Sequence, residues 1–310
     1  MTARNAPALS VQLFPFGAQL VDDLTGTLAR IKSLGYDAVE PVRRTGTPQW
    51  VKDSIRRAIG DDSHFTFRPE PDVNALRAAL ADSGLTVGSC HVPLPEGDAA
   101  EAIFDEQEAL GNRMLVVPAL FDPERGALEG FHDRAGIERS AERVNVAARL
   151  ARSRGMRLGY HNHFDELRTD FGSRSGLELF FELTEPDVFA EVDVYWCHVG
   201  GRNPAELIET LGPRVELIHV KDGSGIVGEA NTAVGAGVLD FPAILAAASR
   251  ARSYIVEFDQ ADDLWAALDD SLRFLVKQTP TGPLAGPDSP TPSNDHVNSV
   301  PQRGDHQHDE

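Results

Sequence analysis

The chain has 310 residues, of which 41% are hydrophobic, a length that suits one large domain or two ordinary ones. Its formal net charge of −19 argues against general nucleic-acid binding, which needs clustered Lys and Arg, and against binding to anionic membranes. No apolar run approaches the roughly 20 residues of a membrane-spanning helix, and no secretory signal is found. Two isolated cysteines, Cys90 and Cys197, exclude a disulfide framework. We therefore expect a reduced, cytoplasmic protein.

Short runs of β-forming residues alternate along the chain with amphipathic helical patterns. The predicted strands are 11–14, 37–40, 85–90, 113–117, 156–160, 188–194, 215–220 and 254–258. The predicted helices are 22–34, 73–83, 99–110, 133–154, 177–183, one that begins at Asn203, 240–248 and 261–276. A long irregular segment, 42–71, is predicted to be an active-site loop with a short helix near 51–59.

Strict alternation of strand and helix implies parallel strands joined by helical crossovers. Eight such units in this length favour a closed (β/α)8 TIM barrel, a single α/β domain over residues 1–278. An open doubly wound sheet is the alternative, but the usual Gly-rich turn after the first strand is absent.

The composition changes at residue 279. Pro, Ser, Gly, Asp and His dominate 279–310, and large apolar residues are almost absent. Such a segment cannot bury enough surface to offset its ordering entropy, so we predict a disordered C-terminal tail.

Polar and charged side chains stand at the ends of most predicted strands. In a TIM barrel these ends form the catalytic rim. The candidates are Glu40, His91, His161, His163, Glu191, Asp193, Trp196, His219, Lys221, Asp222, Glu257 and Asp259. Individually, such residues have structural explanations: strand-end acids such as Asp222, Asp240 and Asp259 often cap the next helix, and Trp196 fits a rim core residue equally well.

The joint pattern is more informative, because four consecutive strands, the fifth to the eighth, each deliver an oxygen or imidazole ligand to one rim. Parallel neighbours lie about 4.8 Å apart, so four such side chains can converge on one ion. A mixed His/Asp/His/Glu shell suits Mn, Co, Zn or Fe better than Ca or Mg. Glu191 and Asp193 share a strand face, and Asp193, nearer the rim, is the predicted ligand. His161 and His163 also share a face; either reaches the ion, and the other contacts substrate.

Six segments together carry a resemblance to a known group. They are L-A-R-I-K-S-L-G-Y-D-A-V-E (28–40), G-Y-H-N-H (159–163), E-V-D-V-Y-W (191–196), H-V-K-D (219–222), V-G-A-G-V-L-D-F (234–241) and Y-I-V-E-F-D (254–259). In this order, over about residues 10–277, the sequence resembles the xylose-isomerase-like sugar phosphate isomerase/epimerase superfamily. That superfamily also contains dehydratases, lyases and a DNA-repair endonuclease branch.

The resemblance implies a TIM barrel with one divalent metal ion, often manganese, with Co, Zn, Fe or Mg as alternatives. The superfamily's usual ligands are Glu, Asp, His and Glu on strands five to eight. Asp193, His219 and Glu257 match the last three, whereas His161 replaces the first glutamate, a change shared by some members with H-x-H. In epimerases of this group the first and last carboxylates form the proton-transfer pair, so His161 departs from that mechanism.

We therefore expect a metal-dependent sugar isomerase or epimerase that acts on a keto sugar or cyclitol through an enediolate. The catalytic base is expected among Glu257, His163 and Glu166, with Lys221 stabilising an oxyanion or returning a proton. His91, Trp196 and Glu40 are the expected substrate contacts.

Three other functions are weighed against this expectation. β-Elimination by a dehydratase or lyase on a 3-keto sugar, keto-glycoside or inosose starts from the same enediolate. Phosphodiester hydrolysis conflicts with the acidic balance, and a sugar-binding protein without turnover is the remaining alternative. The expected partner is a small carbohydrate, not nucleic acid or membrane, and homo-oligomerisation is left open.

Overall fold

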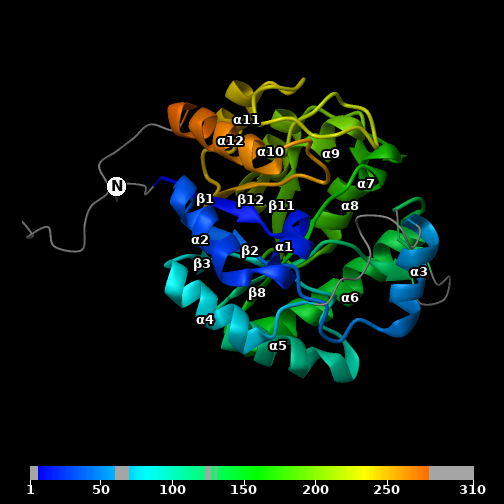
Figure 1. Ribbon diagram of the computed structural model, residues 1–310. Helices are drawn as coiled ribbons and strands as arrows, with labels where there is room; N and C mark the ends of the chain where they lie inside the picture. The colour runs from blue at the N-terminus through cyan, green and yellow to red at the C-terminus, as the bar shows by residue number, and fades with distance from the viewer. Residues whose placement is uncertain (1–5, 60–69, 123–126, 130, 279–310) are drawn as a thin grey trace, which may run out of the picture. The chain divides into compact units, whose positions relative to one another are not determined.

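A parallel sheet organises the chain, and its short strands are spread along the described residues from Ala8 to Val256 (Figure 1). The computed structural model describes residues 6–59, 70–122, 127–129 and 131–278. The sheet has nine strand segments in the order β3-β2-β1-β13-β12-β11-β8-β5-β4, and all of their pairings are parallel. Their bounds are β1 Ala8–Gln12, β2 Ala38–Glu40, β3 Thr86–Val87, β4 Cys90–His91, β5 Met114–Val117, β8 Arg157–His161, β11 Phe189–Asp193, β12 Val215–Val220 and β13 Ser253–Val256.

The sheet closes on itself because β3 and β4 are two pieces of one broken strand. Only Gly88 and Ser89 separate them, and β3 pairs with β2 whereas β4 pairs with β5. The amide of His91 also donates to the carbonyl of Pro41 at 2.9 Å, which extends the β2 side along β4. The described strands therefore form the eight-stranded barrel that the alternation predicts.

Helices follow the barrel strands. They are α1 Gly17–Asp22, α2 Leu24–Leu34, α3 Gln49–Ile59, α4 Val73–Ser83, α5 Ala100–Ala109, α6 Arg134–Ser153, α7 Asp165–Arg168, α8 Gly176–Leu183, α9 Val194–Val199, α10 Pro204–Leu211, α11 Phe241–Ala247 and α12 Leu264–Gln278. Side-chain caps begin several of them: Asp72 and Asp133 cap α4 and α6, Ser175 forms a capping box with Glu178, and Asn203 caps α10. None of the described helices combines the length and apolar character that crossing a bilayer requires.

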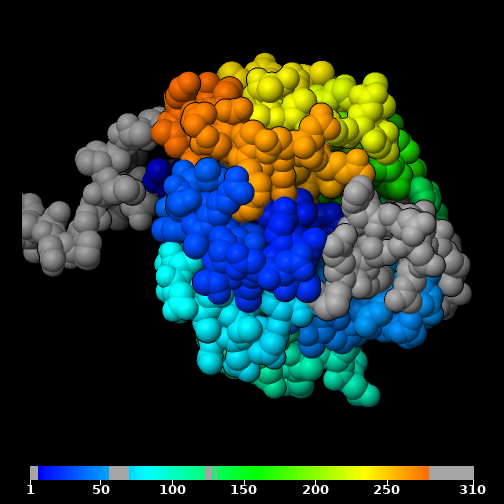
Figure 2. All heavy atoms as spheres, viewed as in Figure 1, coloured from blue at the N-terminus to red at the C-terminus, as the bar shows by residue number. Residues whose placement is uncertain are grey.

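The first and last parts of the described barrel lie side by side, as Figure 2 shows for the blue and orange surfaces. β1 pairs with β13 from Ala8 opposite Ser253 to Val11 opposite Val256. Beside this pairing the Trp265 ring lies 5.1 Å from the Phe16 ring and 4.0 Å from the Arg30 guanidinium. The closed barrel thus joins segments from opposite ends of the sequence.

Several predicted strand ends differ from the structure by one or two residues: the third, fifth and eighth strands end at His91, His161 and Val256 rather than at residues 90, 160 and 258. The first strand ends at Gln12 rather than at residue 14, because the Gln12 side chain accepts a hydrogen bond from the Phe14 amide and a 3-10 turn (Phe14–Phe16) with Pro15 follows. The sixth strand ends at Asp193, where α9 begins. The predicted tail, 279–310, lies outside the described residues.

Inside the barrel, small and large side chains interlock at the floor. Val116, Phe189, Leu217 and Ile255 form a buried apolar cluster separate from the main core. Gly159 on β8 faces this cluster, and a Cβ atom there would lie 2.3 Å from the Phe189 ring. The floor therefore has no room for one more carbon at residue 159.

We predict that Gly159→Ala destabilises the barrel by about 1–3 kcal/mol through overpacking against Phe189. Gly88→Ala is the matched control, because its Cβ would meet no heavy atom closer than 3.6 Å. Urea unfolding of both variants measures the difference. Equal stability of the two would show that the floor relaxes without cost.

Candidate metal and active site

Strand alternation builds the barrel interior in layers above the apolar floor. Two residues beyond Gly159, Phe189, Leu217 and Ile255, the strands present His161, Glu191, His219 and Glu257. Asp193 and Lys221 follow one step nearer the carboxyl ends of β11 and β12. All six side chains are buried, and Glu257 is the most exposed of them at 7%. The C-terminal end of the barrel is therefore charged and polar.

Four of these side chains form what we call the outer group: His161, Asp193, His219 and Glu257. They come from four adjacent strands or their ends, and one donor atom from each lies within 4.8 Å of the others. His219 Nδ1 lies 2.7 Å from Glu257 Oε2. Asp193 Oδ2 is buried and has no hydrogen-bond partner among the described residues, although the Lys221 ammonium lies 3.3 Å from it. Two imidazoles and two carboxylates fit a divalent cation of the Mn, Co, Zn or Fe type.

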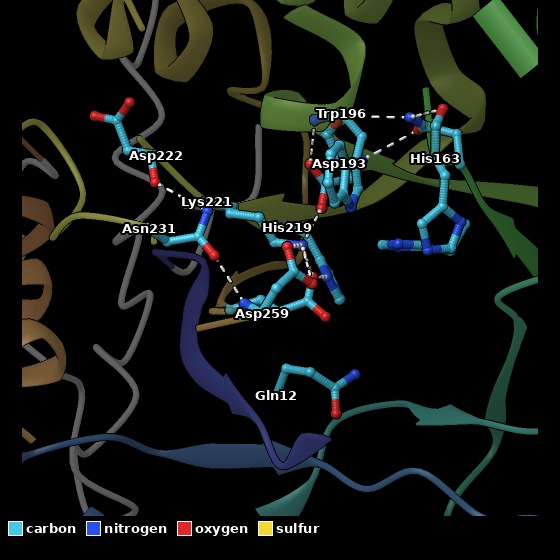
Figure 3. A network of polar contacts seen from close by, with 12 residues as sticks. Gln12, His163, Asp193, Trp196, His219, Lys221, Asp222, Asn231 and Asp259 are labelled. Atoms are coloured by element: carbon cyan, nitrogen blue, oxygen red, sulfur yellow. Dashed lines mark hydrogen bonds and ion pairs between the residues drawn. The ribbon is translucent and has the colours of Figure 1, made fainter. Parts of the chain in front are cut away.

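Lys221 supplies the positive charge beside the outer group (Figure 3). Its ammonium lies 2.9 Å from Glu257 Oε2, 3.3 Å from Asp193 Oδ2 and 3.1 Å from Asp259 Oδ2. Burial alone lowers the pKa of Lys221, but the carboxylates of Asp193, Asp259 and Glu257 outweigh it and raise that pKa. Lys221 is therefore a protonated donor at the barrel mouth.

Asp193 belongs to the outer group and also has a structural role. Its Oδ1 accepts the Trp196 amide at 2.8 Å and so caps α9. Its own amide donates to Asn162 Oδ1 at 3.1 Å, which ties β11 to the end of β8. Burial raises the pKa of Asp193 to about 6, while Lys221 opposes the shift. The carboxylate is thus fixed with one oxygen left for the barrel interior.

A second set of side chains, the inner group, lies on the other side of His161 and His219. It consists of Glu40, His91 and Glu191. Glu191 Oε2 lies 2.7 Å from His91 Nε2, 3.1 Å from His161 Nδ1 and 3.2 Å from His219 Nε2. Glu40 Oε1 lies 2.7 Å from His219 Nε2. Both carboxylates are fully buried, with 0% exposure.

The segment after β8 carries His163 to the mouth of the barrel. Glu166 fixes this segment: its Oε1 accepts from the Tyr160 hydroxyl at 2.7 Å and its Oε2 from the His163 amide at 3.1 Å. The His163 ring lies 5.0 Å from the His161 ring and 6.2 Å from the Trp196 ring. Burial, followed by the Lys221 charge, lowers the pKa of His163 to about 4, so its imidazole is neutral at pH 7.

Trp196 and Lys221 contact each other at the rim. The Lys221 ammonium lies 4.9 Å from the centroid of the Trp196 ring, within range of a cation–π interaction. The ring also packs 5.3 Å from Phe164. Trp196 is half-buried, so it serves as a rim core residue and retains an accessible part.

The predicted caps at the strand ends divide into two roles. Asp240 caps α11, as predicted. Asp222 instead accepts four backbone amides, from Gly223, Gly235, Gly237 and Leu239, at 2.9 to 3.3 Å. It therefore holds the long loop between β12 and α11 rather than a helix end.

A cavity of about 470 Å³ lies at the same end of the barrel, lined by residues that follow β1, β2 and β13. Asp259 lines it and also binds Lys221 through both oxygens, at 3.2 and 3.1 Å. The four donors of the outer group do not line the cavity; Asp259, which does, connects it to Lys221 beside that group.

Sequence reasoning identified most of this constellation. The four predicted ligands His161, Asp193, His219 and Glu257 converge as expected. Glu40 and His91 lie in the inner group, behind the histidines, and Glu166 is occupied by two protein donors. Sequence reasoning missed Gln12 and Ser89, which both donate to Glu40, and Asn162. The signal for Gln12 is a polar residue on the inward face of β1.

We predict that Glu166 makes the stability of the protein depend on pH. Burial raises its pKa in the folded state to about 7 from an ordinary value of 4.5. Its contribution to folding is therefore complete below about pH 4.5 and is lost as the pH rises through about 7, a change on the order of 3 kcal/mol. Glu166→Gln should remove this part of the pH dependence, measured as the free energy of unfolding at several pH values. Parallel curves for the two proteins would contradict the assignment.

Comparisons with known proteins agree with this architecture. The sequence matches the model of the xylose isomerase-like TIM barrel family over residues 28–278. Comparison with curated proteins finds no match.

Three solved structures illustrate the likeness. A sugar phosphate isomerase/epimerase from Parabacteroides distasonis ATCC 8503 has a TM-score of 0.66 and 22% identity, covering 89% of this chain and 95% of that chain. A D-allulose 3-epimerase from Methylomonas sp. has a TM-score of 0.58 and 14% identity, covering 90% and 100%. A probable 3-DHS dehydratase from Bacillus anthracis has a TM-score of 0.61 and 13% identity, covering 87% and 98%. Identities this low establish a shared fold, and the family match over residues 28–278 establishes that the chain belongs to the xylose isomerase-like TIM barrel family.

Proposed function

We propose that the protein is a divalent-metal-dependent isomerase or epimerase that acts on a keto sugar or cyclitol through an enediolate. The observation that carries this proposal is the outer group, in which four buried donors from four adjacent strands converge beside the Lys221 ammonium. Similar folds in structures named as sugar epimerases support the substrate class.

His161, Asp193, His219 and Glu257 would hold the cation, with manganese as the expected ion. When bound, a divalent cation polarises a substrate carbonyl and stabilises negative charge on its oxygen. The buried setting strengthens such electrostatic interactions, because little water competes with the charges there.

His163 is the proposed base. Its imidazole stands at the barrel mouth and is neutral at pH 7, so it can take a proton from the carbon next to the carbonyl. The electron pair of the broken C–H bond then forms the enediolate. Glu257 is less suited to this step, because Lys221 and His219 outweigh its burial and hold its pKa well below the usual range. Glu166 positions His163 through the hydrogen bond to its amide.

Lys221 is the proposed acid. It is buried at the barrel mouth, and three carboxylates keep it protonated. It can stabilise the enediolate oxygen and donate a proton to it. Delivery of a proton by Lys221 to the same carbon from the opposite face would complete an epimerisation, and return of the proton from His163 to the neighbouring carbon would complete an isomerisation. Trp196 offers a flat apolar face to the sugar ring.

β-Elimination is the second candidate, and His161 favours it. A two-carboxylate proton pair requires a glutamate where His161 stands, whereas elimination needs one base and one acid. His163 would remove the proton, and Lys221 would protonate the departing β-hydroxyl or β-glycosyl oxygen as the C–O bond breaks. A dehydratase among the similar folds supports this alternative.

The ligand set predicts that Asp193→Asn and Glu257→Gln each lose most of the bound metal while the barrel stays folded. Elemental analysis of the purified proteins measures the metal, and thermal unfolding measures the fold. Stoichiometric metal in both variants would rule out this ligand set.

The mechanism predicts metal-dependent deuterium uptake next to the carbonyl when a ketose or 3-keto sugar is incubated in D2O. His163→Gln should abolish the exchange and keep the metal, whereas Glu257→Gln should lose both. The product identifies the reaction: an epimer or isomer supports the first candidate, and an unsaturated or shortened product supports elimination. Metal without exchange on any such sugar would refute the proposed chemistry.

A further inference from the structure

His161 and His219 form a partition between the outer and inner groups. His219 directs Nδ1 to Glu257 in the outer group and Nε2 to Glu40 in the inner group, at 2.7 Å each. His161 directs Nδ1 to Glu191, at 3.1 Å, which leaves Nε2 on the other side of its ring. Each ring therefore has one nitrogen on each side of the partition.

The two sides cannot both use these rings as ligands for a cation. A neutral imidazole has one protonated nitrogen and one acceptor nitrogen, so it presents a lone pair to one side only. The four residues His91, His161, Glu191 and His219 also have donors within 4.8 Å of one another. Because this set shares both partition rings with the outer group, the two sets are alternatives for one cation.

The carboxylates of the inner group are placed to accept hydrogen bonds from the protonated ring nitrogens of His161 and His219. Glu191 Oε2 lies within hydrogen-bond distance of His161 Nδ1 and His91 Nε2. Glu40 is itself fixed: Gln12 Nε2 donates to its Oε1 at 2.8 Å, and the Ser89 hydroxyl donates to its Oε2. A carboxylate held in this way accepts the N–H of an imidazole and sets both its tautomer and its ring orientation.

We propose that Glu191 and Glu40 are positioning residues that hold the protonated nitrogens of His161 and His219, so that His161 Nε2 and His219 Nδ1 face the cation. This inference rests on the metal site of the proposed function. It assigns to two buried glutamates a role in metal affinity without direct contact with the ion.

The first test is the affinity for Mn²⁺, measured by isothermal titration calorimetry. Loss of a carboxylate behind a ligand histidine typically weakens metal binding about 10- to 100-fold. We therefore expect Glu191→Gln and Glu40→Gln each to weaken Mn²⁺ binding by about that factor. Glu106→Gln is the matched control, because Glu106 is also a largely buried glutamate but it pairs with Arg43, at 2.6 Å, and has no part in either group. Its Mn²⁺ affinity should equal that of the unsubstituted protein.

The same titration separates this inference from the proposed function. Weak Mn²⁺ binding by Asp193→Asn, together with full Mn²⁺ affinity in Glu191→Gln and Glu40→Gln, would overturn the inference and leave the proposed ligand set intact. Full affinity in Asp193→Asn and Glu257→Gln, together with loss in Glu191→Gln, would place the cation in the inner set and overturn both.

Proton–nitrogen NMR of the unsubstituted protein, labelled at histidine and loaded with diamagnetic Cd²⁺, reads the tautomers directly and needs no variant to fold. We expect His161 to carry its proton on Nδ1 and His219 on Nε2. Protons on the opposite nitrogens would overturn the assignment, whatever the affinities of the variants.

Discussion

Burial of charge is the constraint on which the rest of this barrel depends. Glu40, Glu191 and Asp193 have no exposed surface, and an ionised carboxylate in such a place is costly unless it is paired and hydrogen-bonded. The structure supplies partners in alternation: imidazoles lie between the inner and outer carboxylates, and Lys221 lies between the outer carboxylates and Asp259. Glu191, His219 and Lys221 each have three charged or imidazole partners, so the loss of one group weakens the contacts of several others.

The geometry of the parallel strands explains why the charges gather where they do. Alternate residues of β8, β11, β12 and β13 point inward, so each strand contributes one residue to each layer. Phe189, Leu217 and Ile255 close the floor, and the titratable groups begin one layer above it. Asp193 opposes His219 in the β11–β12 register, which brings a carboxylate and an imidazole together by backbone pairing alone.

The sequence predicted much of this arrangement because strand alternation and the ends of parallel strands are local features. Strand alternation places Asp193 and Glu191 on one face of the strand. It does not show that Asp193 belongs to the outer group and Glu191 to the inner group. Glu40 was expected to contact substrate, whereas it lies at 0% exposure behind His219. Gln12 and Ser89 acquire their roles only when three strands meet around Glu40, a contact between distant segments that no local pattern encodes.

In the proposed function, the histidine at the end of β8 links the inner carboxylates to the reaction. A glutamate at residue 161 would bring negative charge directly to the outer group, whereas His161 brings a neutral ring with Glu191 behind it. A carboxylate behind an imidazole makes the ring a stronger metal ligand. The outer group then contains two carboxylates, of Asp193 and Glu257, beside the single ammonium of Lys221. Such a site has a protonated ammonium in Lys221 and a neutral base in His163, an asymmetric pair. In the proposed chemistry, that asymmetry suits the departure of an oxygen leaving group as well as it suits reprotonation of carbon, so the substrate's own β-substituent would decide which of the two follows the enediolate.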